Sequence, residues 1–221
     1  MTSDLWCAPH VHLATIDEDV IVLDLLEDQY DCLVDAAVWL TAKDDGGIHV
    51  RDQAAADALL EAGIAIHDPP PSLRRPRVPP KRDLSIPANP PRVEILRALV
   101  GLAVATAVFQ KKSLLELIQL NPFVSLPDSR KSTGRGAFPE DEIAVLLTAT
   151  RHARPWVPFE GECLQRAFQL RYYLAHRGIS TDWVFGVRTW PFSAHCWLQV
   201  DDVVIGDRLE RVARYTPIMM G

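Results

Sequence analysis

The chain has 221 residues and is 48% hydrophobic, enough for the core of one large domain or of two small ones. Its four cysteines, Cys7, Cys32, Cys163 and Cys196, have irregular separations that fit neither a CxxC zinc pattern nor a secreted disulfide framework. The net charge of −6 is unevenly distributed, since residues 1–67 carry 14 Asp and Glu against two basic residues. A phosphate backbone would repel such a segment, which argues against nucleic-acid binding.

Targeting signals are absent from the sequence pattern. The first ten residues lack the basic and apolar regions of a secretory signal. The most apolar run, residues 98–110, is shorter than the roughly 18 residues that span a bilayer. We therefore expect no membrane span and a cytoplasmic location with reduced thiols.

The first 35 residues contain three short runs rich in β-branched residues and separated by polar turns. Such runs predict a three-stranded antiparallel meander. The runs are residues 11–17, 20–26 and 29–35.

Helical patterns follow these runs. Residues 35–42 indicate a short helix, and Asp52 is placed to cap a second helix that ends at Gly63. Residues 64–67 fit a further strand or a helix end. Strands followed by helices within 70 residues indicate a small α+β or winged-helix-like unit. Such a unit usually binds a partner, and an exposed sheet edge can accept an added peptide strand.

Residues 68–92 hold nine prolines and predict a semi-rigid linker between two domains, residues 1–67 and residues 93–221. The linker also carries six Lys and Arg against two Asp, a net charge of +4. We expect these to be solvating charges, although a basic patch for nucleic acid is the alternative.

The second domain begins with helical patterns. Residues 91–121 predict one or two helices that are apolar on all sides and therefore central in the core. A loop is expected over residues 121–138. Pro139 can occupy the first turn of a helix over residues 139–153, whose acidic start suits the helix dipole.

A nucleophile candidate stands at the start of the next helix, which Gly178 terminates. Cys163 begins an apolar stripe at helical spacing, continued by Ala167, Leu170 and Leu174. At that position the thiol meets unpaired N–H groups and the positive end of the helix dipole, which favour thiolate. A buried structural cysteine is the alternative interpretation.

Three strand patterns follow that helix, with an Asp201–Asp202 turn between the second and the third. His195 lies on the second strand and Asp207 is expected on the neighbouring third strand. A helix packed on this sheet can bring both toward Cys163, as thiolate, base and orienting carboxylate. Because side chains alternate along a strand, Cys196 is expected to point away from this triad.

These motifs resemble those of a known family. Cys163-Leu-Gln-Arg166, Phe185-Gly-Val-Arg188, Ala194-His-Cys-Trp197 and Gly206-Asp207 look like the B protein of lasso-peptide biosynthesis, a leader peptidase with a transglutaminase-like and papain-like catalytic half. Cys196 stands where that family usually has alanine. The resemblance covers roughly residues 139–215.

The resemblance implies a fold class and a function. It implies an α+β chain with a winged-helix-like recognition domain of three strands and three helices, followed by a cysteine protease domain. The leader of a ribosomally made lasso precursor would add a strand along residues 29–34 and meet the helix of residues 52–66. The expected leader-binding residues are Gln29, Tyr30, Asp31, Cys32, Leu33, Val34, Leu59 and Leu60. Ordinary sheet positions are the alternative for each residue singly.

The implied reaction is cleavage at the leader–core junction by Cys163, His195 and Asp207, without a cofactor. The freed core amine would then pass to an asparagine-synthetase-like cyclase that uses ATP. Two alternatives stay open: acyl transfer to an amine, and a catalytically silent peptide-binding protein. A zinc site at Cys163, His195, Cys196 and Asp207 is disfavoured because neighbours on a strand point to opposite faces. His152 is a weaker candidate base, because nothing nearby in the sequence would orient it.

Overall fold

The computed structural model describes residues 3–70, 74, 76–84, 88–120, 140–157 and 161–221. The loop expected over residues 121–138, and Pro139, lie outside this part of the chain. By contacts the chain divides into two compact units. Unit 1 comprises Met1–Pro79, Val184–His195 and Arg214–Gly221, and unit 2 comprises Pro80–Trp183 and Cys196–Ala213. The boundaries at residues 67/68 and 92/93 stay a prediction.

Unit 1 contains the expected three-stranded meander. Its strands are β2 (Val11–Ile16), β3 (Asp19–Asp24) and β4 (Gln29–Leu33), antiparallel and in that order. Asp17 and Asp28 turn the chain between them with φ of 52° and 51°. Aspartate tolerates this left-handed conformation better than most side chains, so the acidic turns have a structural use.

A second sheet of unit 1 was not predicted. Its four strands have the order β5-β6-β1-β7. They are β1 (Ser3–Cys7), β5 (Leu40–Ala42), β6 (Gly47–Val50) and β7 (Ala65–Ile66). The pairing of β1 with β6 joins Ser3 to Val50, a contact between segments too distant for local sequence patterns to indicate.

Helices are fewer in this region than the resemblance implies. The helix capped by Asp52 is confirmed as α1 (Gln53–Glu61), with the Asp52 carboxylate accepting from the Ala54 N–H and Gly63 at a φ of 71°. The helix expected over residues 35–42 is wrong, because only the 3₁₀ turn η1 (Ala36–Val38) forms before β5. Among the described residues of the range 3–67 the structure therefore has one α-helix, whereas the resemblance implies three.

The proline-rich segment is anchored in part. The guanidinium of Arg74 donates to the carbonyls of Ala8 and Val11, and that of Arg77 donates to the carbonyl of Leu13 at 2.7 Å. The expectation that the basic residues of this segment are solvating charges is therefore wrong for these two. Buried carbonyls at the start of β2 need donors, and arginine supplies several in a fixed geometry.

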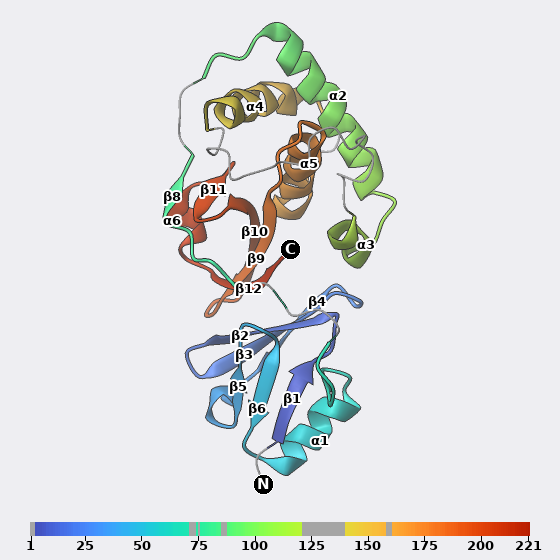
Figure 1. Cartoon of the computed structure of the whole chain (residues 1–221), viewed down its shortest axis with the longest axis vertical. Coiled ribbons are helices and arrows are strands. Elements are labelled where there is room, and N and C mark those ends of the chain that lie inside the picture. The colour runs from blue at the N-terminus through green and yellow to red at the C-terminus, as the bar shows by residue number, and fades with distance from the viewer. Residues whose placement is uncertain (1–2, 71–73, 75, 85–87, 121–139, 158–160) are drawn as a thin grey trace. The chain divides into compact units, whose positions relative to one another are not determined.

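Helices make up much of unit 2. They are α2 (Arg92–Phe109), α3 (Leu114–Gln119), α4 (Glu140–Ala153) and α5 (Cys163–His176), and a short α6 (Leu209–Val212) follows later. A 3₁₀ turn, η3 (Arg154–Trp156), extends α4. Figure 1 shows α2 alongside α4 and α5, in agreement with the contacts of these helices.

The predicted central position of α2 is wrong. Only one side of α2 is buried, through residues such as Ala98, Leu102 and Ala105. Val100 on the other side is 57% exposed, and Leu96 and Val104 are exposed with it. The all-round apolar composition therefore concealed an ordinary one-sided helix.

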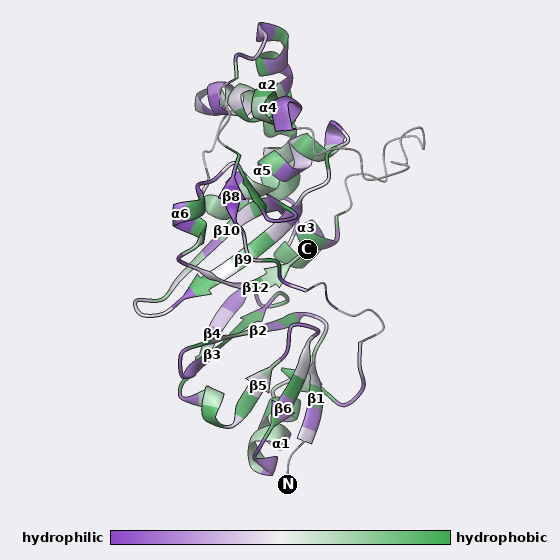
Figure 2. Cartoon of the chain, turned by 60° about the vertical axis from the view of Figure 1, so that its left-hand side comes forward, coloured by the Kyte–Doolittle hydropathy of each residue, from purple (hydrophilic) through white to green (hydrophobic). Residues whose placement is uncertain are grey.

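A five-stranded sheet has the order β12-β9-β10-β11-β8. The strands are β8 (Arg82–Asp83), β9 (Asp182–Arg188), β10 (Ser193–Val200), β11 (Val203–Ile205) and β12 (Thr216–Met220). The three strands expected after α5 are confirmed, whereas β8 and β12 were not predicted. Figure 2 shows β9 and β10 as largely hydrophobic, in keeping with their burial.

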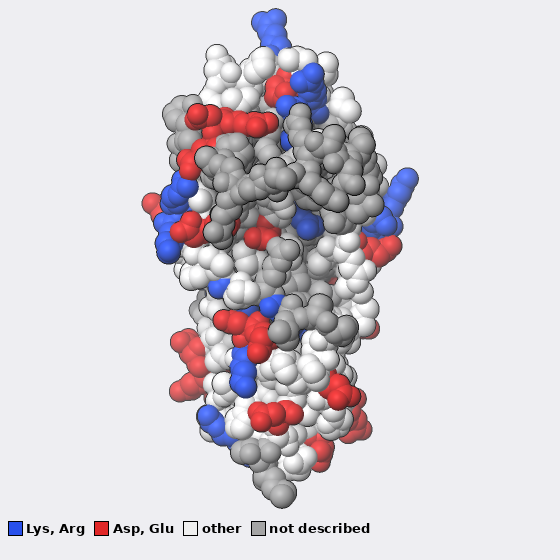
Figure 3. Space-filling view, in the orientation of Figure 1, with Lys and Arg blue, Asp and Glu red and all other residues white. Residues whose placement is uncertain are grey.

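Charge on the surface follows the sequence. Figure 3 shows more acidic than basic side chains over residues 3–67 on the face drawn. No helix within the described residues is both long and apolar enough to cross a membrane.

Candidate active site

Cys163 is the first residue of α5, as the sequence predicted, and its side chain is half-buried. Glu162 before it is extended, with φ −68° and ψ −172°, and its side chain makes no capping bond. The carbonyl of Glu162 accepts from the Arg166 N–H at 3.1 Å, which begins the helix. The sulfur therefore stands at the positive end of the helix dipole, where an anion is stabilised.

Cys196 is the residue that sequence reasoning misplaced. Its thiol is in hydrogen-bond contact with Cys163 instead of pointing away from it. The bond to Cys163, burial and the negative charge of Asp207 together raise the pKa of the Cys196 thiol well above its usual value. Cys196 thus keeps its proton and can donate it to the Cys163 sulfur. No sequence signal other than the departure from alanine marked this position.

Aromatic packing fixes α5 against β9 and β10 in unit 2. The ring of Phe168 lies 5.8 Å from that of Trp183, and the Arg171 guanidinium lies 5.8 Å from the same indole. Trp183 also contacts the Cys196 thiol. The face of the sheet that bears Trp183 and Cys196 is therefore the one covered by α5.

Asp207 lies just beyond β11, not on it, because the strand ends at Ile205. Gly206 turns the chain there with a φ of 81°, and a Cβ at this position would come within 2.6 Å of Leu170 on α5. The Asp207 carboxylate accepts from the Arg208 N–H at 2.8 Å. Asp207 is close enough to Cys196 for its charge to affect that thiol.

His195 precedes Cys196 on β10 and is 4% exposed. Its ring centroid lies 5.3 Å from that of Tyr215. The Arg188 guanidinium lies 5.6 Å from the Tyr215 ring, and the Tyr215 hydroxyl lies 3.4 Å from the Ser193 hydroxyl. Tyr215 was not predicted from the sequence. The structure thus brings Cys163 into contact with Cys196 and Asp207 close enough to affect the Cys196 thiol. The convergence of Cys163, His195 and Asp207 stays a prediction.

The weaker candidates near the nucleophile differ in exposure. His152 and Trp156 are exposed, on α4 and at the end of η3. Gln165 folds over the chain before α5, since a Cβ on Gly161 would come within 2.0 Å of its amide oxygen. No three His, Cys, Asp or Glu side chains in the described ranges are placed to hold a metal ion.

The expected leader-binding strand, β4, is the last strand of its sheet, and among the described residues β3 is its strand partner. Residues 29–33 are β4 itself, and Val34 follows it and is 63% exposed. The ring of Tyr30 lies 5.6 Å from that of Phe192 within unit 1. The indole N–H of Trp190, two residues before Phe192, donates to the Asp19 carboxylate at 3.1 Å.

The expected leader-binding residues on α1, Leu59 and Leu60, do not lie beside β4. Leu59 is 4% exposed and belongs to the core of unit 1, and Leu60 packs partly buried against that core. The helix that carries them contacts β1, β6 and β7 of the other sheet. Figures 1 and 2 both show α1 distant from β4 within this unit.

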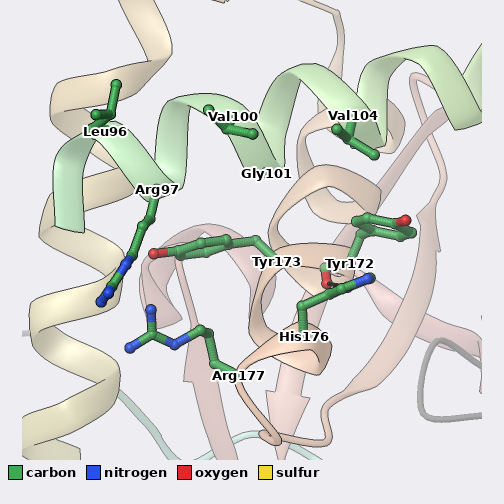
Figure 4. Close-up of a pocket in the computed structure, with 9 residues that line it drawn as sticks. All are labelled: Leu96, Arg97, Val100, Gly101, Val104, Tyr172, Tyr173, His176 and Arg177. Carbon is green, nitrogen blue, oxygen red and sulfur yellow. Dashed lines mark hydrogen bonds between the residues drawn. The ribbon is translucent and has the colours of Figure 1, made fainter. Parts of the chain in front are cut away.

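A pocket of about 490 Å³ lies between α2 and α5 in unit 2 (Figure 4). Leu96, Val100 and Val104 line it, and Arg97, Arg177 and the Tyr173 hydroxyl converge at one end. Glu94, although buried, binds all three of these polar groups. Burial opposes its ionisation, but the hydrogen bonds from Tyr173 and Arg177 outweigh burial and lower the pKa of the Glu94 carboxyl. The Glu94 carboxylate is therefore fully engaged by groups of the protein itself, and the two guanidinium groups leave this end of the pocket with one positive charge in excess.

Comparison with known proteins finds two partial matches. Residues 114–220, just under half of the chain, match the family model of the Transglutaminase-like superfamily, and the chain combines helices with strands. A 49-residue stretch is 41% identical to the microcin J25-processing protein McjB of Escherichia coli. The match spans 22% of this chain and about a quarter, 24%, of that relative's length.

The two matches together confirm the resemblance to the lasso-peptide B proteins. No solved structure matches the chain.

Proposed function

We propose that this chain is a cysteine endopeptidase that binds the leader of a lasso precursor peptide and cleaves it at the leader–core junction. The observation that carries the proposal is the position of Cys163. It begins a helix of the transglutaminase-like domain, and its sulfur is half-buried and in contact with a second, protonated thiol. A hydrogen bond from that thiol and the helix dipole both favour a thiolate at Cys163.

The proposed reaction has two steps. The Cys163 thiolate attacks the scissile carbonyl, and His195 protonates the departing amine, which leaves a thioester. Water activated by His195 then attacks the thioester and restores the thiol. Asp207 orients the imidazole, as the third member of such triads does. The product is a core peptide with a free amine, which a partner cyclase would join to a carboxyl side chain of the core.

Recognition of the leader is assigned to residues 1–67, the unit expected to be winged-helix-like. We place the added strand on β4, because its free edge offers backbone groups to a peptide. We do not include Leu59 and Leu60 in the proposed leader-binding surface, because Leu59 lies in the core of unit 1 and Leu60 packs against that core. Binding on the same chain as the protease raises the concentration of the scissile bond near Cys163. We propose three regions: recognition by residues 1–67, a linker over residues 68–92 and the peptidase over residues 93–221. We also propose that the protein is cytoplasmic.

The test follows cleavage of a lasso precursor peptide by mass spectrometry, with the peptide taken from a short reading frame sought beside the chain's gene. Cys163→Ala is expected to lower the cleavage rate by ~1,000-fold or more while leaving leader affinity unchanged. His195→Ala is expected to lower it comparably, whereas His152→Ala serves as the matched control and keeps the wild-type rate. Cleavage at the wild-type rate by Cys163→Ala would disprove the proposal.

Acyl transfer is the second candidate, because transglutaminases use a thioester at the same kind of site. A small primary amine added to the reaction distinguishes the two. Hydrolysis leaves the mass of the leader product unchanged by the amine, and acyl transfer adds the amine to the leader's new C-terminus. Binding of the leader without either product would instead indicate a silent peptide-binding protein.

A further inference from the structure

Two of the four cysteines form a pair. Cys163 and Cys196 are both reduced, and their thiols are in hydrogen-bond contact. They come from the start of α5 and from β10, 33 residues apart in the sequence. Cys7 and Cys32 lie in unit 1, on β1 and β4. The proposed nucleophile therefore has a thiol neighbour that the reaction does not require.

The surroundings hold this pair in place. Trp183 contacts the Cys196 thiol and packs against Phe168 of α5, one turn beyond Cys163. On the other side, Gly206 allows Leu170 of α5 to approach the chain after β11. Because both sides of the helix start are packed, the two sulfurs stay neighbours. A disulfide requires sulfurs about 2 Å apart, so thiols already in contact need only a small further approach.

The two thiols differ in ways that assign them different roles. Cys163 is half-buried, so a small oxidant can reach it, and the helix dipole favours its thiolate. Cys196 is 5% exposed and is kept protonated by Cys163, by burial and by Asp207. Oxidation therefore begins at Cys163, and Cys196 follows as the resolving thiol.

We propose that Cys163 and Cys196 form a peroxide-reactive dithiol site, which closes to an intramolecular disulfide and so protects the nucleophile from irreversible oxidation. In the first step the Cys163 thiolate attacks hydrogen peroxide, the O–O bond breaks, and sulfenic acid and hydroxide form. In the second step the Cys196 sulfur displaces the hydroxyl group, which leaves with the thiol proton as water. A dithiol reductant reverses the closure by thiol–disulfide exchange.

The proposed dithiol site depends on the cysteine at position 196, where the resembling family usually has alanine. With the alanine usual in the resembling family, sulfenic acid at Cys163 would have no neighbouring thiol, and a second molecule of hydrogen peroxide would oxidise it to sulfinic acid. The site itself depends only on the two thiols. Only the link between disulfide formation and loss of cleavage depends on the proposed function.

The experiment treats the full-length chain with hydrogen peroxide, blocks the remaining thiols with iodoacetamide and maps the peptides by mass spectrometry. We expect a linked pair of peptides holding Cys163 and Cys196, with Cys7 and Cys32 alkylated. Cleavage of the precursor should be lost in parallel and regained after dithiothreitol. In Cys196→Ala the same treatment should yield sulfinic acid at Cys163 and a loss that dithiothreitol does not reverse.

Two controls make the outcome decisive. Cys32→Ala keeps the Cys163–Cys196 pair and should give the same linked pair of peptides as wild type. Cys196→Ser tests the missing thiol with a side chain closer in size. Sulfinic acid at Cys163 in the wild-type chain, or a disulfide of Cys163 with any other thiol, would overturn the inference. A linked pair in a chain that never cleaves the precursor would uphold the dithiol site and overturn the peptidase assignment instead.

Discussion

The Tyr30 ring on β4 packs against the Phe192 ring, three residues before His195 along the chain. Both residues belong to unit 1, which thus includes the proposed leader edge and the segment leading into the proposed base. The contact is tilted, at 55° between ring planes, a geometry that aromatic pairs favour. A peptide bound along β4 would lie next to this pair.

Tyr30→Ala is expected to weaken leader binding by about 2- to 10-fold, because an aromatic contact contributes ~0.5–1.5 kcal/mol. Fluorescence anisotropy of a labelled leader peptide measures the change. Thr15→Ala, on the β2 edge of the same sheet, is the matched control and should bind as wild type. Weaker binding by Thr15→Ala together with unchanged binding by Tyr30→Ala would move the leader site to the opposite edge.

Gly101→Ala is expected to destabilise unit 2. A Cβ at Gly101 of α2 would come within 2.7 Å of the Tyr173 ring on α5, and the bond from the Tyr173 hydroxyl to Glu94 limits how far that ring can move. We expect a loss of ~1–3 kcal/mol in the free energy of unfolding, measured by urea denaturation. Helix propensity alone would favour alanine by ~1 kcal/mol, so a more stable variant would contradict the close approach. Val100→Ala, on the exposed side of α2, is the control with little expected change.

His12 should make unit 1 sensitive to acid. Burial, together with the positive charges of Arg74, Arg77 and His10, lowers the pKa of His12 from 6.5 to about 3. An unfolded chain therefore binds this proton at a higher pH than the folded chain does. The stability contributed by neutral His12 is complete above pH 6.5 and is lost as the pH falls from 6.5 toward 3.

The loss approaches at most ~1.4 kcal/mol for each pH unit in that window. Urea denaturation at pH 7 and pH 5 should show a smaller acid-induced loss for His12→Gln than for wild type. His67→Gln removes an exposed histidine and should keep the wild-type pH dependence. Equal pH dependence in wild type and His12→Gln would show that His12 is protonated alike in the folded and unfolded chains.

The sequence predicted well those helices and strands whose ends are marked by nearby residues. Asp52 and Gly63 mark the two ends of α1, and Gly178, at a φ of 78°, follows α5 as expected. The meander β2-β3-β4 was indicated by its runs of β-branched residues and by the polar turns between them. In contrast, β1 and β12 take their partners from β6 and β9, far along the chain, and no nearby residue signals that pairing.

For the candidate site, too, the sequence predicted the features that depend on neighbouring residues and missed those that depend on packing between distant segments. Cys163 at the start of a helix follows from local spacing, whereas the side of β10 that faces α5 depends on how the helix packs. Alternation predicts that Cys196 and His195 differ in direction, but it does not predict which side chains of the strand reach the start of α5. The packing of Phe168 on Trp183 decides that Cys196 lies on the side of α5.

Unit 1 is built from three separate segments of the chain, which limits how this protein can be cut into fragments. Its three chain segments come from the beginning, from the β9–β10 connection and from the C-terminus. Cutting the gene after residue 79 would separate the first segment from the other two, so a fragment made that way would expose surfaces that are covered in the whole chain. Grafting a foreign recognition module onto the rest of this chain would therefore need matching changes around residues 184–195 and 214–221.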